Sequence, residues 1–74
     1  MTIHYDAISS LTERQTEVIE AVIDGQTDRE IGVNLCISHR TVHNHLQNIF
    51  DKLGVRSRTK AAVLYLAHDL TSAD

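Results

Sequence analysis

The sequence predicts an all-α protein built from four helices. Apolar residues recur at helical spacing along most of the 74-residue chain, serine and threonine caps precede the periodic segments, and no proline interrupts them. A chain of this length makes one domain with one small core. We expect a leader or linker over residues 1–10, the helical domain over residues 11–70 and a tail over residues 71–74. Ile3, Tyr5 and Ile8 alternate in the leader, so this segment could dock on the core.

The first two helices are predicted from matching start signals. Thr12 followed by Gln15, and Thr27 followed by Glu30, each form the capping-box pattern that begins a helix. Gly25 is the natural left-handed stop of the first helix. The apolar stripes are Val18, Ile19, Val22 and Ile23 in the first helix, and Ile31 and Leu35 in the second. The second helix is about two turns long and therefore depends on tertiary packing.

A third helix, over residues 38–53, is predicted to have two distinct faces. Ser38 can accept hydrogen bonds from the first-turn amides, and Gly54 followed by Val55 is typical of a Schellman stop. The apolar face consists of Val42, Leu46, Ile49, Phe50 and Leu53. The opposite face consists of Arg40, His43, Asn44, Gln47 and Asp51.

The connection between the second and third helices is only three residues long, Cys36 to Ser38. Two helices joined so tightly are predicted to form a helix-turn-helix, which presents its second helix to the major groove of DNA. We expect Cys36 to pack as a small apolar residue. Gly32 costs roughly 1 kcal/mol of helix propensity relative to alanine, so we expect close packing between the two helices at this position.

A fourth helix is predicted from Ser57 to about His68, and it is apolar almost all round. If Ala62, Tyr65 and Leu66 face the core, four apolar side chains remain outside, namely Val63, Leu64, Ala67 and Leu70. Either the helix is sunk deeper than expected, or it carries a self-complementary patch. We favour the second interpretation, which predicts a two-fold homodimer through these four residues.

Charge is unevenly distributed along the chain. The net charge is −3, but residues 38–61 contain five basic residues and one acidic residue, whereas residues 1–37 contain two basic and seven acidic residues. A separation this sharp predicts a surface with one basic face. Chance clustering of basic residues on a solvated helix would give the same count. Charge alone therefore does not show whether the protein has a basic binding face.

Composition and patterning exclude several classes of protein. The chain is 42% hydrophobic and 23% charged, which disfavours disorder, and no apolar run is long enough to cross a membrane. The amino terminus lacks the features of a secretory signal, and a single cysteine suits a reducing cytoplasm. No nucleophile, base and orienting group occur together, so we expect neither an enzyme nor a bound cofactor.

Residues 11 to about 68 resemble the LuxR/GerE-type helix-turn-helix domain. The resemblance rests on residues at fixed spacings: Leu11-Thr12, Arg14, Glu17-Val18, Gly25, Glu30-Ile31, Leu35, Ile37-Ser38, Thr41-Val42, His45, Ile49, Lys52-Leu53-Gly54-Val55, Arg58 and Ala61. It implies a four-helix fold and sequence-specific binding of double-stranded DNA as a dimer. It also implies transcriptional regulation in bacteria.

The resemblance further implies roles for individual residues. The positions that read bases are His43, Asn44 and Gln47, with Arg40 ahead of them. The implied phosphate contacts are Thr27, Ser38, Thr41, His45, Lys52, Arg58 and Lys60. The exposed chemistry agrees, because asparagine and glutamine pair with adenine and arginine with guanine or phosphate. Many relatives have lysine where this chain has His43, and alanine where it has Gly32.

The histidines allow two further interpretations. His39 and His43 have the i, i+4 spacing that can bring two imidazoles to one metal ion, but no third ligand is evident nearby, so no metal site is predicted. Protonation of His39, His43 and His45 in acid would strengthen their attraction to phosphate.

The leading hypothesis is a dimeric transcription factor that binds an inverted repeat in DNA. The alternative is a protein-interaction module of the same fold that docks on RNA polymerase or another regulator and has little DNA affinity. Replacing Asn44 and Gln47 with alanine separates the two hypotheses, because DNA binding would be damaged whereas docking through the fourth helix would survive. In either case we expect a cytoplasmic protein with no membrane partner, associated with the nucleoid when bound to DNA.

Overall fold

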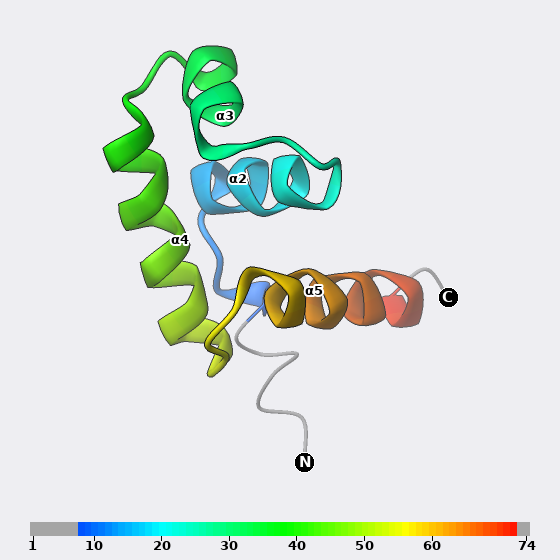
Figure 1. The fold of residues 1–74 in the computed structure, drawn as a ribbon. Helices are drawn as coiled ribbons and strands as arrows, with labels where there is room; N and C mark the ends of the chain where they lie inside the picture. Colours follow the sequence, from blue (N-terminus) through cyan, green and yellow to red (C-terminus); the bar gives the residue numbers. More distant parts are fainter. Residues whose placement is uncertain (1–7, 73–74) are drawn as a thin grey trace.

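The computed structural model describes residues 8–72 and the side chains of residues 8–68. Its helices are α2 (Glu13–Ile23), α3 (Asp28–Leu35), α4 (His39–Leu53) and α5 (Arg58–Ser72). In Figure 1, α4 runs along one side of the molecule, and α3, α2 and α5 are stacked beside it. Helices α2 and α4 each pack against the other three helices. The all-α, four-helix prediction is confirmed.

The core is built from the apolar stripes of the helices. The fully buried side chains are Val18 and Ile19 of α2, Ile31 of α3, Val42, Ile49 and Leu53 of α4, and Ala61 of α5, and Leu46 is 2% exposed. Burial of each large aliphatic side chain contributes roughly 1.5–3 kcal/mol, so these contacts explain why the two-turn helix α3 is stable here.

The last part of the expected leader packs into the domain. Ile8 is 6% exposed and belongs to the core cluster, and its carbonyl accepts a hydrogen bond of 3.1 Å from the Leu11 amide. The expected docking is therefore confirmed for Ile8, which lies within the predicted leader. Ile3 and Tyr5 lie outside the described residues.

The predicted helix starts and stops are present. Both capping boxes form, with the amides of Gln15 and Glu30 donating to the hydroxyls of Thr12 and Thr27 at 3.1 and 3.2 Å. The remaining starts and stops are as follows: Ser38 caps α4, the Ser57 hydroxyl accepts from the Lys60 amide at 3.1 Å, and Gly25 and Gly54 have φ values of 88° and 70°. These positive values require glycine's freedom because a Cβ atom is disfavoured there.

Helix α5 differs from the prediction in its length and its orientation. It extends to Ser72, so the predicted tail begins inside it. Ala61 is buried, and Leu64 and Tyr65 pack against the core, whereas Leu66 is 44% exposed. Our inward placement of Leu66 was wrong, and Leu64 is half-buried rather than fully outside, because the helix is oriented by Ala61, and the positions three and four residues later share its face.

Candidate nucleic-acid interface

A tight turn joins α3 to α4 and sets the angle between them. Cys36 adopts the left-handed conformation, with φ 62° and ψ 39°, and the Ile37 amide then donates to the Gly32 carbonyl at 2.9 Å. Ile37 packs against the core, and Cys36 is exposed. The expectation that Cys36 packs as an apolar residue was wrong, because the reversal of the backbone at Cys36 directs the next residue, Ile37, inward instead.

Gly32 allows the turn to approach α3 closely. A Cβ atom at this position would lie 2.6 Å from the carbonyl oxygen of Ile37 and 3.4 Å from the amide nitrogen of His39. Close packing is therefore the reason for this glycine, as expected. The nearest group, however, is a carbonyl of the turn rather than a side chain of α4.

Helix α4 presents a continuous polar face to solvent. Arg40, His43, Asn44 and Gln47 are all exposed, while Val42, Leu46, Ile49 and Leu53 on the other side are buried. Among the side chains described, those of residues 8–68, these four polar groups make no hydrogen bond or ion pair. The four predicted base-reading residues therefore lie together on a rigidly held helix, and their donors and acceptors are available to a ligand.

The amino terminus of α4 carries the polar groups expected to face an anion. The Ser38 hydroxyl accepts from the Thr41 amide at 3.1 Å and lies 3.0 Å from the Thr41 hydroxyl. The amides of His39 and Arg40 have no partner among the described residues, and they lie at the positive end of the helix dipole. His45, one turn further along, is half-buried.

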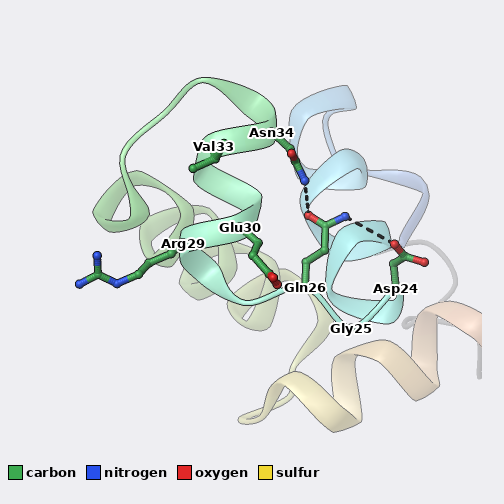
Figure 2. Close-up of a pocket in the computed structure, with 7 residues that line it drawn as sticks. All are labelled: Asp24, Gly25, Gln26, Arg29, Glu30, Val33 and Asn34. Carbon is green, nitrogen blue, oxygen red and sulfur yellow. Dashed lines mark hydrogen bonds between the residues drawn. The ribbon is translucent and has the colours of Figure 1, made fainter.

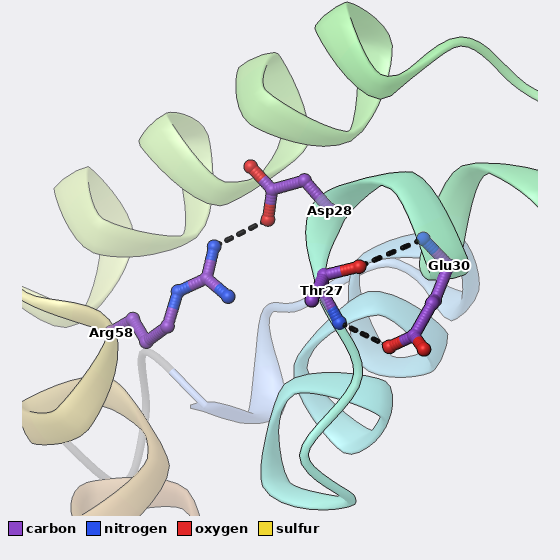
Figure 3. Close-up of polar contacts among 4 residues, drawn as sticks. All are labelled: Thr27, Asp28, Glu30 and Arg58. Carbon is purple, nitrogen blue, oxygen red and sulfur yellow. Dashed lines mark hydrogen bonds and ion pairs between the residues drawn. The ribbon is translucent and has the colours of Figure 1, made fainter.

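Two of the predicted phosphate contacts are engaged within the protein. The Lys52 ammonium donates to the Ser10 carbonyl at 3.0 Å and to Oε1 of Gln15 at 2.9 Å. Arg58 forms an ion pair with Asp28 (Figure 3). Lys60, by contrast, is exposed. The structure thus gives Lys52 and Arg58 partners that are 30 residues or more away in the chain, and sequence spacing offered no signal for them.

The first turn of α3, where Thr27 is predicted to contact a phosphate, carries negative charge that would repel an anion. The Thr27 hydroxyl accepts from the Glu30 amide, and the Thr27 amide donates to Oε1 of Glu30 at 2.8 Å. Asp28 and Glu30 therefore bring two carboxylates to the first turn (Figure 3). The Thr27 hydroxyl keeps its own proton to donate, so a phosphate contact from Thr27 is still chemically possible.

The predicted dimer patch is partly exposed. Val63 is 61% exposed, Ala67 is exposed and Leu64 is half-buried, and the three line one shallow groove with Val55 and Lys60. The side chain of Leu70 lies outside the described residues. Three of the four predicted residues are thus brought together on α5.

A second shallow hollow lies over the α2–α3 connection, and sequence reasoning did not find it. It is lined by Asp24, Gly25, Gln26, Arg29, Glu30, Val33 and Asn34 (Figure 2). The side-chain amide of Asn34 donates to Oε1 of Gln26 at 2.8 Å, and the amide of Gln26 donates to Asp24 at 3.5 Å. These bonds link α3 to the turn before it.

No metal site or membrane span is found in the part of the chain that the structure describes. Among the side chains of residues 8–68, no three histidine, cysteine or acidic groups are placed so that they could hold a metal ion. None of the helices described is both long and apolar enough to cross a membrane. His39 and His43 are both exposed on α4.

The fold and the exposed face of α4 define a helix-turn-helix DNA-binding domain. The chain belongs to the luxR family of bacterial regulatory proteins, whose GerE family model matches residues 9–65. This match confirms the resemblance on which the expected fold and the expected class of function rest. The chain thus carries the DNA-binding domain of a transcriptional regulator.

Several relatives are regulators of different lengths. The chain is 45% identical over 53 residues to the spore germination protein GerE of Bacillus subtilis, which covers 72% of each protein. It is 38% identical over 65 residues to the probable transcriptional regulatory protein SgaR of Hyphomicrobium methylovorum, covering 88% of this chain and 31% of SgaR. It is 46% identical over 54 residues to the transcriptional regulatory protein LiaR of Bacillus subtilis, covering 73% of this chain and 26% of LiaR. The chain thus spans less than a third of SgaR and LiaR. No solved structure matches the chain.

Proposed function

We propose that this chain binds double-stranded DNA sequence-specifically as a homodimer, with α4 in the major groove of each half of an inverted repeat. The observation that carries the proposal is the polar face of α4. Arg40, His43, Asn44 and Gln47 are exposed there without a partner in the described chain, while the opposite side of the helix is locked in the core.

Base recognition would come from the amide and guanidinium groups of this face. Asn44 and Gln47 each offer a donor and an acceptor that match N7 and N6 of adenine, and Arg40 can pair with O6 and N7 of guanine. His43 lies between Arg40 and Asn44 in the chain and adds either a donor or an acceptor, depending on its tautomer. A site read in this way contains both adenine and guanine.

Phosphate contacts would surround that face. Ser38, Thr41 and the free amides of the α4 amino terminus suit one phosphate, because helix amino termini favour anions. His45, Lys60 and the proton of the Thr27 hydroxyl are further donors. We do not assign phosphates to Lys52 and Arg58, because both already have partners within the protein.

Dimerisation would use the exposed apolar side of α5. Val63, Leu64 and Ala67 form one surface, and Leu70 follows Ala67 at helical spacing. A two-fold contact between two copies of α5 would present two α4 helices to half-sites about one helical turn, roughly 34 Å, apart. Such a regulator would act in the cytoplasm and join the nucleoid when bound to DNA.

The proposal is tested by selecting bound duplexes from a random DNA pool with the 74-residue protein. We expect an enriched inverted repeat whose affinity falls steeply as salt rises, because a protein that contacts six to ten phosphates loses about 10³- to 10⁵-fold between 50 and 200 mM salt. A folded protein that enriches no duplex would contradict the proposal. It would favour the interaction module that docks on RNA polymerase or another regulator.

Two alanine variants test the base-reading face directly. Asn44→Ala and Gln47→Ala should each weaken binding by about 1–3 kcal/mol per half-site and relax the preference at one base position. Asn34→Ala is the control, since it removes an exposed side-chain amide from α3 instead of α4. Because Asn34 also donates to Gln26, thermal melting of each variant accompanies the comparison. Equal effects of Asn34→Ala and Asn44→Ala would show that the face of α4 has no special role.

A further inference from the structure

The first turn of α3 contains an acidic group that should oppose DNA binding. Asp28 is the first residue of this helix and directly follows Thr27, whose hydroxyl we proposed as a phosphate donor. The other first-turn acid, Glu30, is held by the capping box through the Thr27 amide. Asp28 takes no part in the cap. Its carboxylate would therefore repel a phosphate at this end of α3 unless another group neutralised it.

Arg58 is that neutralising group. It is the first residue of α5, 30 positions further along the chain, and it reaches across to the Asp28 carboxylate (Figure 3). The side chain of Arg58 is 41% exposed and that of Asp28 is 29% exposed, so the pair is partly shielded from water and salt. The charge of the pair as a whole is zero.

The position of Arg58 in its own helix supports a role in the pair. A cation in the first turn of a helix faces the positive end of the dipole, which is the unfavourable end for an arginine. The stability of α5 therefore does not account for arginine at this position. The contact with Asp28 does, because it is the only hydrogen bond or ion pair of this side chain within the described residues.

We propose that Arg58 supports DNA binding through Asp28, as a positioning residue that masks the carboxylate beside Thr27, rather than as a phosphate contact. This inference rests on the proposed function, in which the start of α3 lies against the DNA backbone. Removing Arg58 would expose the Asp28 charge to a nearby phosphate. Removing Asp28 as well would make Arg58 dispensable.

The test is a cycle of Arg58→Gln, Asp28→Asn and the double variant, measured as affinity for the selected duplex at fixed low salt. We expect Arg58→Gln to weaken binding about threefold to tenfold, as one unscreened charge near the backbone would do. Asp28→Asn alone leaves the Arg58 charge unpaired, so it should strengthen binding, but by a smaller factor than Arg58→Gln loses, because Asp28 directly follows Thr27 whereas Arg58 begins α5. The double variant should return to within about twofold of wild type.

Lys60 provides the matched control, because Lys60→Gln removes one positive charge from the same turn of α5. Asp28→Asn should strengthen the binding of Lys60→Gln no more than it strengthens the binding of wild type, whereas its effect on Arg58→Gln should be larger. A double Arg58 and Asp28 variant that binds as weakly as Arg58→Gln would overturn the inference. A slope of log affinity against log salt reduced by about 0.9 per lost contact would then identify Arg58 as a phosphate contact.

Arg58→Lys is a second test, because this variant keeps a positive charge beside Asp28. Thermal melting of each variant checks that it is folded. We expect Arg58→Lys to bind within about twofold of wild type, because any cation near Asp28 masks its charge. A loss as large as that of Arg58→Gln in a folded Arg58→Lys protein would overturn the inference. Failure of the proposed function is separate, because the wild-type protein would then enrich no duplex.

Discussion

The Nζ atom of Lys52 lies 2.9 Å from Oε1 of Gln15 and thereby joins the last turn of α4 to the first turn of α2. The same Oε1 atom accepts from the Thr12 amide at 3.0 Å, as part of the capping box that begins α2. Lys52 also donates to the Ser10 carbonyl, so three segments of the chain meet at one ammonium group. This lysine lies in the basic segment of the sequence, but its contacts are those of a structural residue.

Lys52→Met should therefore destabilise the fold without changing the number of phosphate contacts. We expect a loss of about 1 kcal/mol in the free energy of unfolding, since two hydrogen bonds from a charged donor are removed at a partly exposed site. Denaturant titration measures this loss, with Lys60→Met as the control that should change stability little. A reduced salt slope of DNA binding in a stable Lys52→Met variant would contradict this assignment.

Gly32→Ala should destabilise the helix-turn-helix. The added Cβ atom would lie 2.6 Å from the Ile37 carbonyl oxygen, so the turn must shift. We expect a net loss of about 1–2 kcal/mol, because overpacking costs typically 1–3 kcal/mol and better helix propensity regains at most about 1 kcal/mol. The measurement is the free energy of unfolding. A variant as stable as wild type would show that the turn can widen at little cost.

Cys36→Gly should stabilise the fold. Cys36 is the one non-glycine residue of the described chain with a positive φ, and a left-handed residue with a Cβ atom costs roughly 1–2 kcal/mol. Glycine avoids this cost but is more flexible in the unfolded chain, so we expect a net gain of about 0.5–1 kcal/mol. The comparison is with Cys36→Val, which should destabilise because a β-branched residue fits this conformation poorly.

The exposure of the Cys36 thiol can be checked independently. The residue is exposed in the folded protein, so a thiol-reactive probe should label it without denaturant. Labelling that occurs only after unfolding would instead support the expectation from sequence, in which the side chain packs inside. The labelling rate of the protein unfolded in denaturant is the reference for a fully accessible thiol.

Val63→Asp should prevent dimerisation while the monomer stays folded. Val63 is 61% exposed, so a charge there costs the monomer little, but it would lie unpaired in a two-fold contact between α5 helices. Sedimentation should show a monomer, and binding to the full inverted repeat should fall toward that of a single half-site. Val33→Asp is the control for sedimentation, because Val33 is 77% exposed on α3, away from the proposed dimer contact. It is no control for DNA binding, because Val33 lies beside Ser38 and His39 at the proposed phosphate site.

The sequence by itself determined the features that depend on hydrogen bonds between near neighbours. The caps at Thr12, Thr27 and Ser38 and the stops at Gly25 and Gly54 join residues at most five apart, so their spacing predicts them. The exposed polar face of α4 follows in the same way from the period of its apolar residues. Together with the family resemblance, these local signals indicated the fold and the class of function.

Only the tertiary structure decided which residues meet across the domain. Arg58 pairs with Asp28 and Lys52 with Gln15, over separations of 30 and 37 residues, because packing brings their helices together. The partial burial of Leu64, the outward placement of Leu66 and the burial of Ile8 have the same origin. A helical period fixes which residues share a face, but the neighbouring helices decide which face is covered. A basic residue looks the same in sequence whether its partner is a phosphate or a distant carboxylate.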